Sequence, residues 1–369
     1  MLEDTYAHSP LDKMFRQADV YGVGYDEERA SKKPIRLAII GCGGVAQSKH
    51  IPAIMRLRTI WEPLELAAVC MRNERQGRKV EETYRTKWYS DYLQMLDEVK
   101  PDGVLVLSPD DKHYEHTMAC LSRGIHVIVE KPITHDLAQA YEMCEYAKKK
   151  GLVLMTVSNK RYSPPYFRAK NCGLTDPAMF VGKFNLGYDY VDILEGGTIH
   201  LFDLVRYFMG DVKALTAVAT HAYDFNRTGY AFDNACIQLE FVSGAVGTVY
   251  TSSTALSLKP WERVEVYGKN RWLSVEDQRT LLLYDDETGP TKLYEPVFPN
   301  TLIFDEEFGG FMGLIENFCE CIRGNATPLV TGYDGLKAYE LVVATHRSLK
   351  EKRRIELPLD RTAAAGTEE

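Results

Sequence analysis

The sequence lacks the features that mark three special classes of protein. No apolar run approaches the length that a membrane-spanning helix needs. Basic residues are in deficit, with 44 Lys and Arg against 52 Asp and Glu and a formal net charge of −8, which argues against nucleic acid as a main partner. The first residues carry Glu3, Asp4 and Lys13 and no apolar core, so we expect no secretory signal and a cytoplasmic protein.

The sequence also lacks any pair of cysteines at the spacing of a metal or redox motif. Cys319 and Cys321 are separated by one residue, which does not place them on one side of a helix. We therefore expect reduced thiols in the core and predict no metal site. The eight cysteines are scattered at positions 42, 70, 120, 144, 172, 236, 319 and 321.

The composition that remains is that of an ordinary globular protein, with 45% hydrophobic and 26% charged residues. A length of 369 residues favours two domains. Residues 1–34 are polar and have no clear period. We interpret them either as an arm that lies on a neighbouring subunit or as a partly disordered leader.

The most specific pattern covers residues 35–46. Residues 35–40 form an apolar run typical of a buried parallel strand, and a glycine-rich turn follows it at once. The turn matches the dinucleotide fingerprint G-x-G-x-x-A, in which the glycines permit a tight turn and close approach of a pyrophosphate to a helix N-terminus. The predicted cofactor contacts here are Gly41, Gly43, Gly44, Val45 and Ala46.

The following segments alternate between strands and helices up to residue 157. Strands are predicted at 64–70, 103–107, 126–129 and 152–157, and helices at 115–122 and 137–150. Near-continuous apolar strands separated by helices indicate a parallel sheet covered on both faces. We therefore predict an α/β Rossmann dinucleotide-binding domain at residues 35–157.

The pattern changes in residues 158–369, the predicted substrate and oligomerisation domain. From about residue 180 the strands become longer and alternate between apolar and polar residues, which predicts a large, mostly antiparallel open sheet. Helices are expected at 198–209, 311–323 and 335–349. This half is therefore predicted to be an α+β domain whose sheet has one face exposed or covered by a partner.

Polar residues follow two of the parallel strands at their carboxyl ends, where such sheets bind ligands. Ser108, Pro109 and His113 follow one strand, and Glu130-Lys131-Pro132 follows the next. Pro132 stiffens its turn and is a candidate for a cis peptide bond. A lysine beside a positively charged nicotinamide ring would have a lowered pKa and serve as a proton or hydrogen-bond donor. The alternative is a surface lysine paired with Glu130.

A second group lies on the predicted helix 198–209. His200 and Asp203 are three residues apart and share a helix face. A histidine oriented by an aspartate suits proton transfer near neutral pH, so both are candidate catalytic residues with Lys131. Without the other motifs, His200 would be interpreted as a structural histidine and not as a catalytic one.

With these motifs in place, the chain resembles the Gfo/Idh/MocA oxidoreductases over about residues 35–357. The resemblance rests on the glycine turn, Ser108 to His113, the Glu130-Lys131-Pro132 triplet, Asn159 to Pro164 and the helix 200–210. It implies hydride transfer between NAD(P) and a ring carbon of a sugar, inositol or sugar derivative. It places the lysine and the histidine beside that carbon, and it implies homodimers or homotetramers formed through the C-terminal sheet.

Two positions depart from the family pattern. Many members carry an aspartate four residues before the histidine, where this chain has Gly196; Glu195 or Asp192 is a possible substitute. The acidic residue that binds the ribose of NAD is replaced by Met71, and Arg72 follows it. Because an arginine suits a 2′-phosphate, we expect NADP slightly ahead of NAD, with Arg72 as a cofactor contact.

The resulting hypothesis is a dehydrogenase in which His200 takes a hydroxyl proton, Lys131 polarises the oxygen and Asp203 orients His200. Three other interpretations stay open: a redox-neutral enzyme that keeps its nucleotide bound, a dinucleotide- or sugar-sensing regulator, and a structural subunit. The candidate substrate residues are Asn159, Arg161, Asn185, Asp189 and Tyr190.

Overall fold

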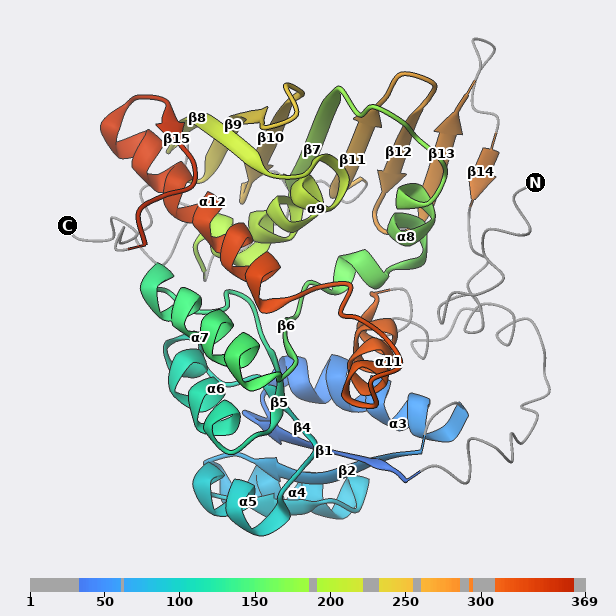
Figure 1. Ribbon diagram of the computed structural model, residues 1–369, viewed down its shortest axis with the longest axis vertical. Coiled ribbons are helices and arrows are strands. Elements are labelled where there is room, and N and C mark those ends of the chain that lie inside the picture. Colours follow the sequence, from blue (N-terminus) through green and yellow to red (C-terminus); the bar gives the residue numbers. More distant parts are fainter. Residues whose placement is uncertain are drawn as a thin grey trace.

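The computed structural model describes residues 33–60, 63–185, 191–221, 232–254, 260–285, 292–294 and 309–361. Two sheets dominate it, a parallel one in the lower half of Figure 1 and a larger one in the upper half. Helices α9 (Ile199–Met209) and α12 (Gly332–Glu351) lie between them. The predicted N-terminal arm lies outside the described residues except for Lys33 and Pro34.

The parallel sheet has the strand order β3-β2-β1-β4-β5-β6 of a Rossmann fold. Its central strand β1 is buried on both faces: Leu37 and Ile39 belong to one hydrophobic cluster, and Ala38 and Ile40 to the other. This burial is why the strand is a continuous apolar run. The strands are β1 (Ile35–Ile40), β2 (Leu64–Cys70), β3 (Lys87–Tyr89), β4 (Gly103–Val106), β5 (His126–Val129) and β6 (Leu154–Thr156).

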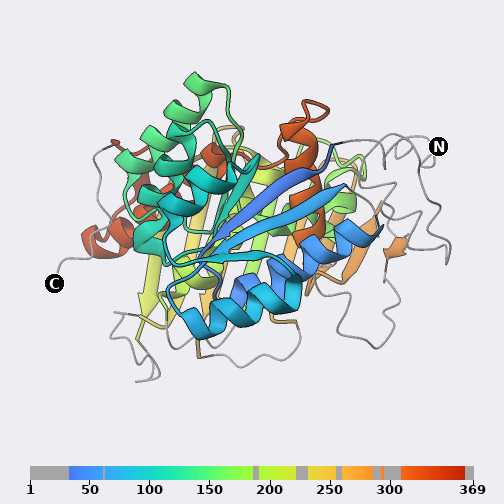
Figure 2. The same ribbon diagram turned by 90° about the horizontal axis from the view of Figure 1, so that it is seen from below.

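Helices connect these strands and cover both faces of the sheet, as Figure 2 shows from below. Side-chain caps start several of them; for example, Asp136 accepts the backbone N–H of Gln139 at the start of α7. Helix α4 and helix α5 were absent from the prediction, as was strand β3. The connecting helices are α3 (Ile51–Ile60), α4 (Glu74–Tyr84), α5 (Tyr92–Val99), α6 (His113–Ser122) and α7 (Leu137–Lys150).

The second sheet has nine strands in the described chain, in the order β14-β13-β12-β11-β7-β10-β9-β8-β15. Only β7 and β10 pair in parallel among these neighbours, so the predicted mostly antiparallel sheet is confirmed. The strands are β7 (Met179–Asn185), β8 (Val212–Thr220), β9 (Asn234–Phe241), β10 (Val246–Ser252), β11 (Glu262–Tyr267), β12 (Trp272–Glu276), β13 (Thr280–Tyr284), β14 (Lys292–Tyr294) and β15 (Ile355–Glu356).

Two helices from the C-terminal segment tie the halves together. Helix α11 (Phe311–Ile322) packs on the Rossmann sheet: Leu314 and Phe318 share a cluster with Leu37 of β1, and Phe318 lies against Gly103 of β4. Helix α12 contacts α7 of the Rossmann half and α9 of the other half. The segment after residue 158 therefore contributes to both halves of the fold.

The face of the second sheet that points away from α9 carries exposed apolar side chains. Strand β9 shows the alternation, since Ile237 and Leu239 are buried whereas Cys236 and Gln238 are exposed. A row across the sheet follows from the strand registers, because directly paired residues share a face. From β9 to β13 this row is Glu240, Val246, Met179, Tyr267, Trp272 and Tyr284.

Candidate functional site

The glycine turn after β1 has the geometry that its fingerprint predicts. Gly41 adopts a φ of +91°, and a Cβ there would collide with the backbone of Leu107 and Ser108, so only glycine fits. A Cβ on Gly43 or Gly44 would meet nothing within 4 Å, which leaves the turn open to a ligand. The N–H of Gln47 bonds to the carbonyl of Gly43 at 3.0 Å, so a helix starts here. The turn therefore fits the pyrophosphate of a dinucleotide.

The turns after β4 and β5 are tied together by His113. Its Nδ1 lies 2.7 Å from the carbonyl oxygen of Pro132, and its Nε2 lies 2.9 Å from that of Ser108. The Lys131–Pro132 peptide bond is cis. His113 is completely buried, and its ring ties together the two turns on which we predicted that a cofactor rests. Pro109 is exposed at the rim of this edge.

Glu130 is held from the glycine-turn side by His50, a residue that the sequence analysis missed. The His50 Nε2 lies 3.4 Å from Glu130 Oε1, and the backbone N–H of Lys131 donates to Oε2 at 2.9 Å. Burial would raise the pKa of Glu130, but the contacts with His50 and Lys131 lower it overall. Glu130 is thus a carboxylate that shapes the Lys131 turn. His50 follows the fingerprint by four residues, and no motif marked it.

Lys131 reaches across to the second half of the protein. Its Nζ donates to the carbonyl oxygens of Glu195 and Gly196 at 3.2 and 3.1 Å. These carbonyls belong to η5 (Leu194–Thr198), a π-helical turn that runs into α9. A Cβ on Gly197 would overlap the ring of Phe184 from β7, so glycine lets this turn pack against the sheet. Two main-chain carbonyls therefore hold the ammonium group where the resemblance led us to expect a carboxylate.

His200 lies one turn into the same helical segment and lines a small cavity together with Lys131. The cavity has a volume of about 10 Å³, which is room for about one water molecule. Burial of the ring, followed by the charges of Lys160 and Lys131, lowers the pKa of His200 well below its usual value. The cavity is lined by Lys131, Ile133, Thr156, Val157, Ser158, Ile199, His200, Gly335 and Ala338.

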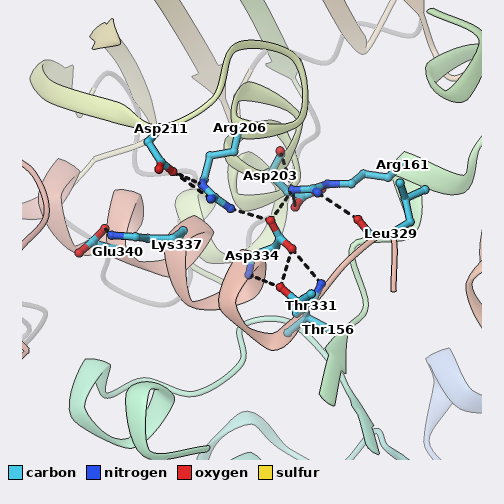
Figure 3. Close-up of polar contacts among 10 residues, drawn as sticks. All are labelled: Thr156, Arg161, Asp203, Arg206, Asp211, Leu329, Thr331, Asp334, Lys337 and Glu340. Atoms are coloured by element: carbon cyan, nitrogen blue, oxygen red, sulfur yellow. Dashed lines mark hydrogen bonds and ion pairs between the residues drawn. The ribbon is translucent and has the colours of Figure 1, made fainter. Parts of the chain in front are cut away.

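Asp203 does not have its predicted partner. Arg161 Nε and one of its terminal nitrogens, Nη2, donate to the two carboxylate oxygens of Asp203 at 2.9 and 2.7 Å (Figure 3). Arg161 also reaches Asp334 at the N-terminus of α12, and Arg206 bonds to the same Asp334 oxygen. Both members of the Arg161–Asp203 pair are buried. The predicted roles are thus corrected: Arg161 is a structural partner of Asp203, and the carboxylate of Asp203 binds Arg161 and not His200.

The remaining predicted residues take several positions. Asn159 is buried and donates its side-chain amide to the carbonyl of Gly309. Asn185 ends β7, and its Oδ1 is buried without a hydrogen-bond partner in the described structure. Arg72 is exposed and makes no hydrogen bond or ion pair within the described part of the chain. Asp189 and Tyr190 lie outside the described residues.

A buried ion pair near His200 was also missed. Lys160 in η4 (Asn159–Tyr162) bonds through Nζ to Glu262 Oε2, and neither residue is more than 3% exposed. The hydroxyl of Tyr166 donates to the other Glu262 oxygen at 2.7 Å. Lys160 is polar and sits between two residues of a recognised motif, but its carboxylate partner is about a hundred residues away in sequence. No spacing rule joins two such residues.

Two family models match the chain. One is described as an oxidoreductase family with an NAD-binding Rossmann fold and matches residues 35–158. The other is described as the C-terminal alpha/beta domain of an oxidoreductase family and matches residues 194–357. Within the described residues, no helix is long and apolar enough to cross a membrane, and no group of three or more His, Cys, Asp or Glu side chains is arranged to hold a metal.

Several characterised proteins are similar over most of the chain. The myo-inositol 2-dehydrogenase of Thermotoga maritima is 28% identical over 88% of this chain and 98% of its own. The NAD(+) scyllo-inositol 2-dehydrogenase of Bacillus subtilis is 26% identical over 89% and 97%. A solved levoglucosan dehydrogenase in complex with NADH and levoglucosan superposes with a TM-score of 0.78 over 89% of this chain and all of its own, at 16% identity, which shows a shared fold.

Proposed function

The chain belongs to the Gfo/Idh/MocA oxidoreductase family, and from this premise we propose that it is an NAD(P)-dependent dehydrogenase of a sugar, an inositol or a related derivative. A hydride moves between the nicotinamide and a ring carbon that bears a hydroxyl group. The observation that carries the proposal is the cavity shared by Lys131 and His200, between the ends of the Rossmann strands and helix α9. The inositol dehydrogenases among the relatives support the substrate class.

His200 is the proposed proton acceptor. Its ring has no hydrogen-bond partner among the described residues, so a ring nitrogen is available for the substrate hydroxyl. Its lowered pKa keeps the ring neutral at physiological pH, which is the form that accepts a proton. When bound, the dinucleotide supplies the hydride acceptor for oxidation or the hydride donor for reduction.

Lys131 is the proposed stabiliser of the substrate oxygen. An ammonium group has three N–H donors, and two of them are directed at the carbonyls of Glu195 and Gly196. The third is left for the oxygen from which His200 removes the proton. The positive charge beside that oxygen stabilises the negative charge that develops there, before the hydride leaves the same carbon.

The preferred cofactor in this proposal is NADP, slightly ahead of NAD. Met71 stands where an acidic residue would repel a 2′-phosphate, and the exposed side chain of Arg72 is available to bind one. Of the similar proteins named above, the levoglucosan dehydrogenase is in complex with NADH, and the Bacillus subtilis enzyme is named for NAD(+). A preference for NADP would therefore separate this chain from them.

The experiment that tests the function is a screen of sugars and inositols with NAD⁺ and NADP⁺, followed by the absorbance of the reduced nicotinamide. Lys131→Ala and His200→Ala are each expected to reduce kcat/KM by at least about 100-fold. Full activity in His200→Ala would remove His200 from the mechanism. No turnover of any polyol or of the matching keto-sugars, with nucleotide bound in the purified protein, would favour a redox-neutral enzyme.

A further inference from the structure

A second and larger pocket lies on the other side of helix α12 from His200. It has a volume of about 660 Å³ and is formed between α7 and the first turns of α12, two helices that contact each other (Figure 1). Its inner wall includes Leu152 to Leu154, at the amino end of β6. Ligand pockets usually have volumes of about 300–1,000 Å³, so this one is large enough for a small organic molecule.

Helix α12 separates this pocket from the site of the proposed chemistry. Tyr333 and Lys337 line the larger pocket, whereas Gly335 and Ala338 line the cavity that contains His200. With about 3.6 residues per turn, these two pairs lie on roughly opposite sides of the helix. A dinucleotide rests at the carboxyl ends of parallel strands, and the larger pocket lies at the amino end of β6. Neither substrate nor dinucleotide would therefore fill it.

Two tyrosine rings in the pocket each lie close to a cation. The guanidinium of Arg361 lies 4.5 Å from the centre of the Tyr141 ring, and Nζ of Lys337 lies 5.7 Å from that of the Tyr333 ring. The Tyr333 side chain is 44% exposed, so its ring is accessible from solvent. A flat ligand can stack on such a ring while a negative group on it meets the neighbouring cation.

Positive charge exceeds negative charge around the pocket. Lys148, Lys337 and Arg361 line it with Glu145, and Glu340 bonds to Lys337 at 2.5 Å (Figure 3), so three cations face two carboxylates. Arg361 and Glu145 are 3.7 Å apart and both more than 60% exposed, which makes their ion pair weak. Lys148 makes no hydrogen bond or ion pair through its side chain within the described part of the chain. Its ammonium group is therefore available to an anion.

We propose that this pocket binds a small planar organic anion, such as an aromatic carboxylate or sulfonate, while the nucleotide and substrate site stays open. The rings of Tyr141 and Tyr333 contact the flat part of the ligand, and Lys148 and Arg361 bind its anionic group. The pocket and the cavity of His200 have no lining residue in common within the described structure. Binding here does not depend on the proposed dehydrogenase function.

The test is a titration of the full-length protein with anilinonaphthalenesulfonate, a planar aromatic anion whose fluorescence rises in an apolar environment. Saturable binding is expected, and Lys148→Ala and Tyr333→Ala should each raise its Kd about tenfold. Both side chains are exposed, so both variants should fold. Lys149→Ala is the matched control, since Lys149 is exposed on the same helix but does not line the pocket.

Phenylnaphthylamine, which has the same rings and no sulfonate, tests the role of charge. Tyr333→Ala should weaken its binding, whereas Lys148→Ala should leave its Kd unchanged. An equal loss for both probes in Lys148→Ala would refute a charge contact. NAD⁺ and NADP⁺ should change neither Kd; displacement of the probe by either nucleotide would place it in the nucleotide site and overturn the proposal.

Cys144 lies on the pocket wall and reports the position of the probe. Burial raises the pKa of its thiol to about 12, so its reaction with N-ethylmaleimide is slow enough to follow by peptide mass spectrometry. At ten times its Kd, the sulfonate probe should slow the labelling of Cys144 about tenfold and leave that of Cys236, exposed on β9, unchanged. Protection of Cys236 in place of Cys144 would place the probe on the second sheet and rule out this pocket.

Discussion

Asp203 shows how a single buried pair can hold the helix that carries a reactive residue. Its carboxylate accepts two N–H donors of Arg161, and Arg161 continues to Asp334 at the start of α12 (Figure 3). Burial raises the pKa of Asp203, whereas Arg161 pulls it down. A two-donor pair of this kind fixes orientation as well as charge. Asp203 therefore belongs to the buried ion-pair network that holds helix α9, the helix that carries His200.

This arrangement predicts that Asp203→Ala lowers stability more than it changes chemistry. Removing one member of a buried pair leaves the other uncompensated, which costs about 3–5 kcal/mol. The free energy of unfolding from urea titration should fall by roughly that amount. The double variant Arg161→Met/Asp203→Leu, which removes both charges, should recover most of the loss.

The exposed pair Arg123–Asp97 supplies the control, and Asp97→Ala should leave the unfolding midpoint unchanged within error. If Asp203→Ala kept full stability and lost activity with a displaced pH profile, Asp203 would act on His200 as the sequence analysis expected.

Arg72 carries the residue-scale prediction on the cofactor. Calorimetric titration should give a lower Kd for NADP⁺ than for NAD⁺, and Arg72→Ala should weaken NADP⁺ binding about tenfold and leave NAD⁺ binding unchanged, since one charge-assisted phosphate contact contributes about 1.5 kcal/mol or more. Arg58→Ala, at the far end of α3, should change neither. Equal effects of Arg72→Ala on both nucleotides would mean that Arg72 does not read the 2′ position.

At the residue scale the sequence indicated those residues whose own turn or helix has a recognisable pattern. Gly41 is required by its own turn, and Lys131 and His200 follow elements with clear patterns. Arg161 and Lys160 could not be assigned, because their carboxylate partners lie 42 and 102 residues away. Spacing along a helix shows which side chains share a face, but it does not show what a distant segment brings to that face.

Among the elements, the π-helical turn η5 is the one on which the site depends. It aims two carbonyls at Lys131 and leads directly into α9. Its placement needs the missing side chain of Gly197, because the Phe184 ring fills that space. Such turns insert one residue into a helix and recur at functional sites.

Gly197→Ala should therefore disturb the site without unfolding the protein. The new methyl group meets the Phe184 ring, so the turn shifts and the carbonyls move away from Lys131; a misplacement of this kind lowers kcat/KM by roughly 10- to 100-fold. Phe184→Ala added to Gly197→Ala should restore part of the activity by making room, while Phe184→Ala alone separates the loss due to the missing ring. If Gly197→Ala keeps wild-type kcat/KM, the turn does not position Lys131.

The strands were predicted correctly where burial gives the sequence a clear pattern of apolar residues. Strand β1 is apolar because both faces are covered, and β9 alternates because one face is exposed. Helix α4 escaped prediction because it is polar, with only Gly77 and Val80 buried. The π-helical turn η5 was not predicted because one inserted residue shifts the helical pattern without changing the amino-acid composition of the segment.

In the whole molecule, segments that lie far apart in the sequence pack together, and the sequence pattern does not show which of them meet. Helix α11 lies near the C-terminus but covers the Rossmann sheet with Leu314 and Phe318, and α12 contacts both halves. A boundary near residue 158 therefore divides the sequence into two patterns. It does not divide the packed structure at the same place, because α11 and α12 come after it and still contact the Rossmann half. The cavity with Lys131 and His200 lies where these halves meet. Their relative position therefore sets the distance between the two reactive groups.

The outer face of the second sheet leads to the prediction about assembly. Met179, Val218, Val246 and Tyr250 are exposed there by between 38% and 67%, on strands β7, β8 and β10. Apolar side chains gathered on one flat face typically mark an association surface. We propose that two copies pair through this face, and light scattering should give the mass of a dimer or a tetramer for the wild type.

Val218→Lys tests that assembly because it places a charge within the proposed interface, where desolvation makes an unpaired charge costly. The mass should fall toward that of the monomer, and it should fall further at low protein concentration. Leu93→Lys is the matched control, since Leu93 is exposed by 39% on α5 of the Rossmann half, away from the second sheet. A monomeric wild type, or the same mass for both variants, would rule out this face as the interface, and the sheet would then face solvent despite its apolar side chains.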